Sequence, residues 1–420
     1  MTDPAPLAPP KPWLTVVGMG DDGPDGLSPA RQALIANAAI LAGNARLMAL
    51  VEKMPGRNEI QKKIVYETLE GFLDDIGAHR DAPGGVVVLA TGDPMSHGVG
   101  VTLSRRFSFA EMLVLPHPGA FSEAAARLGW ALQDVECVSI HNRPPETLLR
   151  HVGHGVRLLV LCRDGKTPSV VAHMLARKGF ADSVMTVFEH LGGVRETRRE
   201  AIIYEWTNEP CADLCLIALD CVLDAGLSVP GALPGLEDDL FDHDGMMTKR
   251  EVRTVTLSSL APTPGALLWD VGAGCGSVAI EWMRVQSRTK AVAFESDRAR
   301  IAKLARNAVL LGVPELDVVF GRAPAILAER PDDEIPDAVF IGGGLGEDGV
   351  LEACWERLRV GGTLVANAVT IEAELRLMAW HQDHGGDLSR ISVSRLEPIS
   401  DRFNAWKAAA PVTHYRVIKQ

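Results

Sequence analysis

The hydrophobic positions of the chain alternate between short continuous runs and sets at helical spacing. The short runs predict buried strands at 13–17, 85–91, 112–115, 157–162, 183–189, 214–219, 266–269 and 290–294. The helically spaced sets predict helices at 29–38, 99–108, 122–128, 168–178 and 277–283. Strands that alternate with helices in this way are typical of the α/β class. The chain is therefore predicted to be α/β throughout.

Breaks in this pattern divide the chain into parts. Residues 1–11 are rich in proline and lack the basic start and apolar core of a signal peptide, so we expect a disordered lead-in. Residues 224–245 are rich in Gly, Pro and Asp, which predicts a linker. The expected domains are 12–223, with lobes at about 12–116 and 117–223, and 246–420.

A segment with three alternating glycines, Asp-Val-Gly-Ala-Gly-Cys-Gly at 270–276, joins a predicted strand to a predicted helix. Its glycines are Gly272, Gly274 and Gly276. Glycine at such a turn permits positive φ and lets the backbone approach a ligand closely. A dinucleotide fingerprint needs its third glycine one position later, at Ser277, so that a pyrophosphate rests on the helix N-terminus. The spacing therefore indicates a nucleotide cofactor without that phosphate group.

Two carboxylates accompany this glycine turn. Glu295 ends the predicted strand at 290–294, where it could accept both ribose hydroxyls of an adenosine. Asp270, at the tip of the preceding strand, is expected to face the ammonium or sulfonium side of a cationic cofactor. Two acids and no basic residue favour S-adenosylmethionine over NAD. The alternative is an ordinary doubly wound sheet with a tight turn.

A second glycine cluster, at 18–23, matches the G-x-G-x-x-G pattern after the predicted strand at 13–17. Taken alone it would suggest a dinucleotide. However, Asp21 and Asp22 would bring negative charge to a phosphate site, and the prolines that follow delay the helix until about Ala30. We interpret this cluster as a glycine-rich loop of a different α/β domain.

Composition and charge exclude several function classes. The chain has 42 Lys and Arg against 54 Asp and Glu, and this net charge of -12 argues against nucleic-acid binding. No apolar run approaches the roughly 18 residues of a membrane-spanning helix. Seven scattered cysteines are typical of a reducing cytoplasm. The only cysteine cluster, Cys211, Cys215 and Cys221, fits core packing better than a zinc site, so we expect no metal.

Three segments of the N-terminal half resemble the tetrapyrrole methylase family over roughly residues 12–225. They are Val16-Val17-Gly18-Met19-Gly20, Thr91-Gly92-Asp93-Pro94 with Gly98 and Gly100 behind it, and the helix start His117-Pro118-Gly119-Ala120-Phe121-Ser122 with Ser122 as N-cap. One departure is the Asp-Asp-Gly at 21–23, where the family commonly has Pro-Gly. The resemblance implies S-adenosylmethionine bound in a bent pose between two α/β lobes, with Gly18, Gly92, Asp93, Pro94, Gly98 and Ser122 at the site.

A cationic cluster, Lys249, Arg250 and Arg253, follows the predicted linker at the start of a helix. Spacings of three and four residues would place Arg253 on one face with the other two. Such a patch could orient the carboxylates of an anionic substrate, with Arg322 as a further cation. The alternative is a solvated helix start neutralised by Glu251.

The segment Met-Thr-Lys-Arg-Glu-Val-Arg at 247–253, some 20 residues before the Asp-Val-Gly motif, is similar to decarboxylating precorrin methyltransferases. The segments at 337–343 and 361–370 are similar to them too. The resemblance implies a Rossmann-like class I methyltransferase domain, with Thr248 and Ala323 also at its S-adenosylmethionine site. With the first resemblance it implies a bifunctional cytoplasmic homo-oligomer of cobalamin biosynthesis. Such an enzyme uses two cofactor sites to methylate ring carbons 5 and 15 of a precorrin and remove carbon dioxide from the ring C acetate.

The implied chemistry needs alignment rather than a strong base. A nucleophilic meso carbon attacks the sulfonium methyl, and the macrocycle is the electron sink for decarboxylation. His243 is a hypothetical proton donor, although an exposed linker histidine is the simpler interpretation. Three alternatives stay open: a nucleic-acid or protein methyltransferase, an NAD-dependent oxidoreductase that uses the glycines at 18–23, and a protein in which one half only binds substrate.

Overall fold

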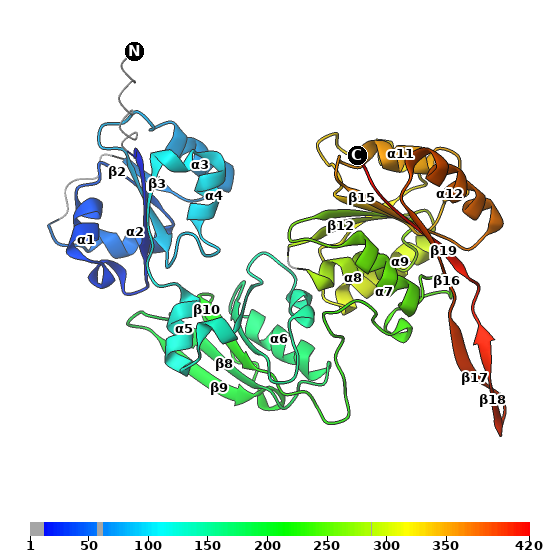
Figure 1. The fold of residues 1–420 in the computed structure, drawn as a ribbon. Coiled ribbons are helices and arrows are strands. Elements are labelled where there is room, and N and C mark those ends of the chain that lie inside the picture. The colour runs from blue at the N-terminus through cyan, green and yellow to red at the C-terminus, as the bar shows by residue number, and fades with distance from the viewer. Residues whose placement is uncertain (1–11, 57–61, 287) are drawn as a thin grey trace, which may run out of the picture. The chain divides into compact units, whose positions relative to one another are not determined.

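The computed structural model describes residues 12–56, 62–286 and 288–420, which form two compact units (Figure 1). Unit 1 comprises 12–142 and Val152–Leu227, and unit 2 comprises Arg143–His151 and Ser228–Gln420. Both are built from helices and sheets, which confirms the α/β class. None of the helices among the described residues is long and apolar enough to cross a membrane.

The first lobe of unit 1 is a parallel sheet with the strand order β3-β2-β4-β1-β5. Its strands are β1 (Leu14–Met19), β2 (Ile40–Gly43), β3 (Lys62–Val65), β4 (Val86–Thr91) and β5 (Met112–Leu115). Its helices are α1 (Pro29–Ala36), α2 (Ala45–Glu52), α3 (Leu69–Gly77) and α4 (Val99–Arg106). Apolar clusters fill both faces of the sheet because its central strands are apolar on both sides. The carboxyl ends of β1 and β4 are therefore brought together at one edge.

The second lobe of unit 1 is a mixed sheet with the order β6-β7-β10-β8-β9. Its elements are α5 (Ala120–Leu128), β6 (Glu136–Ser139), β7 (Arg157–Leu161), α6 (Thr167–Ala176), β8 (Val184–Glu189), β9 (Thr197–Ile202) and β10 (Cys215–Asp220). Only β6 and β7 pair in parallel. The connection from β8 to β9 is too short for a crossover, which takes a dozen or more residues, so these strands form an antiparallel hairpin.

Unit 2 is a seven-stranded sheet with the order β13-β12-β11-β14-β15-β19-β16. Its strands are β11 (Leu267–Val271), β12 (Lys290–Glu295), β13 (Asp317–Phe320), β14 (Ala338–Ile341), β15 (Thr363–Ala368), β16 (Asp387–Ile391) and β19 (Val412–Ile418). Its helices are α7 (Arg250–Leu260), α8 (Ser277–Val285), α9 (Arg298–Leu310), α10 (Ala325–Ala328), α11 (Val350–Arg357) and α12 (Ile371–His384). Strands β11 to β15 are parallel and β19 is antiparallel to β15, so the predicted Rossmann-like arrangement is confirmed.

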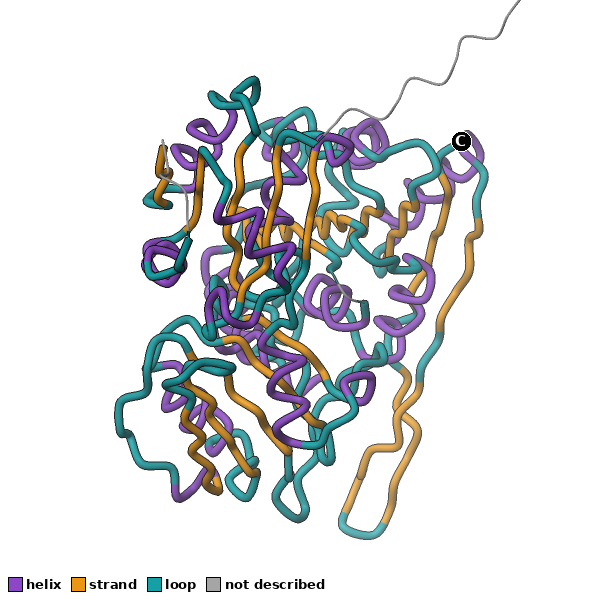
Figure 2. Tube along the Cα trace, turned by 90° about the vertical axis from the view of Figure 1, so that its left-hand side faces the viewer, coloured by secondary structure: helices purple, strands orange, loops and turns teal. Residues whose placement is uncertain are grey.

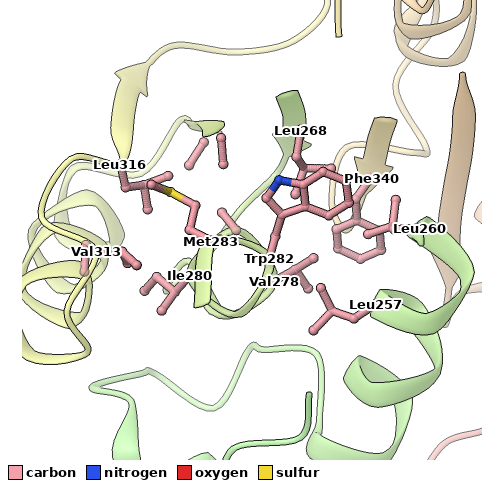
Figure 3. Close-up of a cluster of buried hydrophobic side chains, with 14 of the residues drawn as sticks. Leu257, Leu260, Leu268, Val278, Ile280, Trp282, Met283, Val313, Leu316 and Phe340 are labelled. Atoms are coloured by element: carbon pink, nitrogen blue, oxygen red, sulfur yellow. The ribbon is translucent and has the colours of Figure 1, made fainter. Parts of the chain in front are cut away.

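The core of unit 2 is packed around α8, which is buried from Ser277 to Met283. Figure 3 shows side chains of this helix, among them Trp282, within an apolar cluster that includes Phe340 of the sheet and Leu257 of α7. Helices α7 and α9 flank α8, which explains why it is apolar around much of its surface. The position of α8 is thereby held against β11, directly after the glycine turn.

Unit 2 includes two segments that the sequence pattern does not predict to belong to it. Leu236 and Phe241, from the stretch expected to be a linker, are buried in the α8 cluster. Arg143–His151 also packs in unit 2, where Arg150 forms an ion pair of 3.0 Å with Glu315. A short segment that lies within the sequence of unit 1 therefore belongs to unit 2, and it carries no local sequence signal.

A two-stranded ribbon of β17 (Ser394–Ser400) and β18 (Phe403–Ala408) extends from unit 2, and Figure 2 shows it as a long pair of strands. Its large apolar side chains are mostly exposed, including Leu396, Ile399, Phe403 and Trp406. The base of this ribbon borders the cleft described below.

Candidate functional site

A cleft of about 760 Å³ opens at the carboxyl ends of the parallel strands of unit 2. Its lining comes from the loops after β11, β12, β13, β14 and β15, from residues 245–249 before α7, and from the base of the β17–β18 ribbon. This edge of an open α/β sheet is the usual ligand position, and the volume suits a small-molecule ligand. The cleft is thus a candidate binding site, assembled from segments far apart in the sequence.

The three glycines of the 270–276 turn have different roles. All have positive φ, namely 70° for Gly272, 59° for Gly274 and 82° for Gly276. Gly272 and Gly274 line the cleft, and a Cβ on Gly272 would lie 2.5 Å from the Cα of Gly343. A Cβ on Gly276 would instead meet the Leu304 side chain at 2.7 Å. Gly276 therefore allows α8 to pack on α9, and only the first two glycines shape the cleft.

Glu295 lines the cleft as predicted, but most of its hydrogen-bonding capacity is already used. Its carboxylate accepts backbone N–H groups of Gly274 at 2.8 Å, Ser296 at 2.8 Å and Asp297 at 2.9 Å. A carboxylate has about four acceptor sites, so about one remains, on the oxygen that faces Gly274. The remaining capacity suits one ribose hydroxyl, fewer than the two expected from the sequence.

Asp270 lies behind the glycine turn and is outside the cleft lining. Its side chain is 1% exposed; one oxygen accepts the Ala279 N–H at 3.0 Å, and the other has no partner among the described residues. Burial raises the pKa of Asp270 to about 7. The hydrogen bond from Ala279 lowers this pKa, and the negative charge of Glu295 raises it further. Asp270 therefore joins β11 to α8 rather than presenting its charge to the cleft.

The cationic side chains on the cleft lining differ in whether a carboxylate already pairs with them. The paired ones are Arg300 with Asp244 at 2.9 Å, Arg322 with Glu347 at 2.6 Å, Arg395 with Glu251 at 2.7 Å and Lys407 with Glu397 at 2.8 Å. Lys249 is the exception: within the described ranges no carboxylate pairs with it. Its ammonium is the cleft cation that is most readily available to an anionic ligand.

The prediction that Lys249, Arg250 and Arg253 share one cationic face at the start of α7 differs from the structure. Arg253 is fully buried, where its Nε donates to Glu281 at 2.5 Å and its Nη1 to Asp238 at 3.0 Å. Arg250 is exposed, pairs with Glu237 at 2.6 Å, and does not line the cleft. Burial of the Glu281 carboxylate on α8 draws Arg253 inward, because an isolated buried charge is far costlier than a paired one.

Arg253 nevertheless supports the cleft indirectly. Its Nη1 donates to the Thr248 carbonyl oxygen at 2.7 Å, so the buried ion pair holds the segment that carries Thr248 and Lys249. Thr248 and Ala323 both line the cleft, as does Met247. His243 does not line it, and its Nδ1 accepts the Gly245 N–H at 2.9 Å.

In unit 1 the N-terminal motifs meet at the carboxyl ends of β1 and β4. A Cβ on Gly18 would lie 2.2 Å from the Gly92 oxygen, and a Cβ on Gly98 would lie 2.7 Å from the Pro94 oxygen. Asp93 accepts the Met95 N–H at 2.8 Å. A shallow depression of about 490 Å³, lined by Gly98 among others, adjoins these loops. The motifs that the sequence separates by some 70 residues therefore form one closely packed loop cluster.

Two further features of unit 1 differ from the expectation. Helix α5 begins at Ala120 with Gly119 as N-cap, so Ser122 lies inside the first turn and does not cap the helix. Asp21, expected to repel a phosphate, forms an ion pair with Arg46 and lies 3.4 Å from His190. The charge of Asp21 is thus paired with that of Arg46, a residue that no local pattern connects to it.

Comparisons with known proteins match both units. The profile of the tetrapyrrole (corrin/porphyrin) methylases matches residues 13–205, and that of a precorrin methyltransferase domain matches residues 239–419. The chain is 45% identical to a precorrin-6Y C(5,15)-methyltransferase (decarboxylating) of Sinorhizobium sp., over 96% of each chain. It is 38% identical to the protein of the same name from Mycobacterium tuberculosis, over 97% of this chain and all of the other. A probable cobalt-precorrin-6B C(15)-methyltransferase (decarboxylating) of Pyrobaculum calidifontis is 41% identical over 34% of this chain and 74% of its own.

Proposed function

This chain belongs to the family of decarboxylating precorrin-6Y C(5,15)-methyltransferases, and on that premise we propose that it methylates carbons 5 and 15 of precorrin-6Y and decarboxylates the ring C acetate to give precorrin-8. It is an S-adenosylmethionine-dependent C-methyltransferase of cobalamin biosynthesis, and its substrate is a tetrapyrrole. The observation that carries the proposal is the presence in one chain of a tetrapyrrole methylase unit and a second unit with a glycine-lined cleft.

The residues of the unit 2 cleft fit an adenosyl cofactor. The backbone at Gly272 and Gly274 lines the cleft, and there is no room for a side chain at Gly272. Beside this turn, Glu295 keeps about one free acceptor site. S-Adenosylmethionine supplies an electrophilic methyl group when it is bound. These protein groups then hold its ribose and orient it, and the volume of about 760 Å³ leaves room for part of a second ligand.

We assign methylation at carbon 15 and decarboxylation to unit 2, and methylation at carbon 5 to unit 1. A relative that matches only a third of this chain carries both C(15) methylation and decarboxylation in its name, which supports one site for the pair. In the decarboxylation the bond from the acetate methylene to the carboxylate breaks and its electron pair passes into the macrocycle. Carbon dioxide leaves, and a proton from solvent converts the methylene into a methyl group.

Lys249 is the residue we propose to hold the departing carboxylate before the bond breaks. Its ammonium lines the cleft without a carboxylate partner among the described residues, whereas the other lining cations are paired. Arg250 and Arg253 are left with supporting roles, since neither lines the cleft. An unpaired ammonium offers a carboxylate a positive charge and up to three hydrogen-bond donors, which orient it.

The full chain, incubated with precorrin-6Y and S-adenosylmethionine, tests the function by mass spectrometry. The product should gain two methyl groups and lose one carbon dioxide. Gly272→Ala should leave one methyl addition and no decarboxylation, because alanine at φ 70° is strained and meets Gly343. Gly92→Ala, at φ 57° and 3.1 Å from the Gly119 Cα, should leave the other methylation and the decarboxylation.

Binding measurements separate this proposal from its rivals. Calorimetry of the wild type should give two S-adenosylmethionine molecules per chain, and each glycine variant should give one. Binding of NAD without S-adenosylmethionine would instead support an oxidoreductase. One S-adenosylmethionine molecule per wild-type chain, lost in one glycine variant and kept in the other, would support a half that only binds substrate.

A further inference from the structure

A continuous chain of side-chain hydrogen bonds ends at the wall of the unit 2 cleft. Asn367, the lining residue, donates its Nδ2–H to the Thr256 hydroxyl at 2.9 Å, and its Oδ1 lies 2.8 Å from His414 Nδ1. The other ring nitrogen of His414 lies 2.9 Å from the Ser259 hydroxyl. Thr256 is fully buried and His414 is 4% exposed. These hydrogen bonds therefore connect α7, β15 and β19 beneath the cleft surface.

The backbone enforces this arrangement. Asn367 and His414 are directly opposite each other in the antiparallel pairing of β15 with β19. Thr256 and Ser259 are three residues apart on α7, so both face the sheet from the same side of that helix. Paired residues on one face of a sheet have Cβ atoms only about 5 Å apart, so the Asn367–His414 contact follows from register.

The contact with Thr256 and the contact with His414 together fix the orientation of the Asn367 amide. Burial, together with the nearby charge of Arg416, lowers the pKa of His414, so the ring is neutral at neutral pH. Because an amide oxygen can only accept, the contact with Asn367 Oδ1 assigns the single N–H of the ring to Nδ1, and Nε2 then accepts the Ser259 hydroxyl. Asn367 is then left with one amide N–H and one carbonyl lone pair that no described residue uses.

Asn367 lies on the side of the cleft away from Glu295. Glu295 ends β12 and the glycine turn follows β11, whereas Asn367 is near the end of β15, two strands beyond β11. At about 4.8 Å per strand this places β15 roughly 14 Å from β12. Lys249, at the start of the same helix that holds Thr256, lines the cleft as well.

We propose that the free amide N–H of Asn367 binds a carboxylate of the precorrin, and that Thr256 and His414 are positioning residues that keep this N–H directed into the cleft. The proposal rests on the function assigned above and adds a second group to Lys249 for holding the substrate. Two fixed points orient a carboxylate, and therefore the bond that breaks, where one point leaves it free to rotate.

Matched threonine variants on α7 test the proposal in the full chain. Thr256→Val keeps the shape and removes the acceptor for Asn367, Thr256→Ser keeps the acceptor, and Thr254→Val makes the same change on the exposed face of the helix. Asn367→Ala removes the binding group itself. The measurements are the KM and kcat for precorrin, the decarboxylated fraction of methylated product, calorimetric binding of S-adenosylmethionine, and thermal unfolding.

Thr256→Val and Asn367→Ala should raise KM for precorrin or lower the decarboxylated fraction about tenfold, with cofactor affinity within about twofold of the wild type. Thr256→Ser should restore most of the loss, and Thr254→Val should behave as the wild type. An unchanged decarboxylated fraction and KM in Asn367→Ala would overturn the proposal, as would equal losses in Thr256→Val and Thr254→Val. A wild type that does not convert precorrin would instead refute the proposed function.

Discussion

Replacement of Asp270 by asparagine should stabilise unit 2, and the stabilisation should grow with pH. The carboxylate is 1% exposed, and one of its oxygens has no hydrogen-bond partner among the described residues. Burial therefore raises its pKa from 3.8 to about 7. The folded protein holds this proton more tightly than the unfolded chain. The stabilisation that comes from protonated Asp270 is therefore fully present below about pH 4 and is lost as pH rises through about 7.

The size of the effect follows from the two pKa values. At roughly 1.4 kcal/mol per pKa unit, the interval from 3.8 to about 7 corresponds to a penalty of about 4 kcal/mol in the free energy of unfolding at high pH. Part of that penalty, about 2 kcal/mol, is already present at pH 5, because the unfolded carboxyl is ionised there. Asparagine remains neutral and keeps an oxygen for the Ala279 N–H. The stabilisation by Asp270→Asn should thus increase by about 2 to 3 kcal/mol between pH 5 and pH 8.5.

Hydrogen exchange of the β11 amides, followed by mass spectrometry, measures this difference within unit 2 alone. Wild type and variant are compared at the same pH, so all other titrating groups cancel. Asp337→Asn is the control, since the Asp337 carboxylate is paired with Arg359 at 2.6 Å and accepts the Leu267 N–H at 2.8 Å. A stabilisation by Asp270→Asn that stays constant within about 0.5 kcal/mol across this pH range would refute the assignment of a raised pKa.

Three further substitutions, two of them with a matched control, test the roles of charged groups in unit 2. Lys249→Gln should lower kcat/KM for decarboxylation about tenfold to a hundredfold. Lys407→Gln is the control, since the Lys407 side chain is already paired with a carboxylate, and it should change kcat/KM at most about twofold. Equal effects of the two substitutions would contradict the role of Lys249. Glu295→Gln should weaken calorimetric binding of S-adenosylmethionine about tenfold, and an unaltered affinity would exclude Glu295 from the site. Arg253→Met should destabilise unit 2 by about 3 to 5 kcal/mol in denaturant unfolding, because it leaves Glu281 buried without its partner. Arg250→Met, on an exposed side chain, should cost under about 1 kcal/mol.

The elements that the sequence predicts well are those with strong local patterns. The strands around the glycine turn and the helix that follows it are where the apolar runs indicate them, since buried parallel strands are apolar on both faces. The β17–β18 ribbon and the pairing of β19 beside β15 have no such signal. Strand order depends on contacts between distant segments, and half-exposed strands lack the continuous apolar run that marks a buried one.

Arg253 shows why helical spacing alone does not decide the role of a side chain. The spacing with Arg250 suggests one shared cationic face, yet the two side chains point to different environments. What decides between them is Glu281, which lies on the next helix and is 1% exposed. A buried acid requires a partner, and the sequence does not indicate which of three neighbouring cations will supply it.

The cofactor side and the substrate side of the unit 2 cleft differ in how they are encoded. The proposed cofactor side depends on backbone shape, so Gly272 and Gly274 are placed within one short turn and leave a local motif. The proposed substrate side depends on side chains brought together by strand register, as Asn367 is with His414, 47 residues away. We therefore expect a local motif to indicate the cofactor, whereas the proposed substrate contact of Asn367 depends on the pairing of β15 with β19. Substitutions that shift this register should change substrate binding and leave cofactor affinity intact.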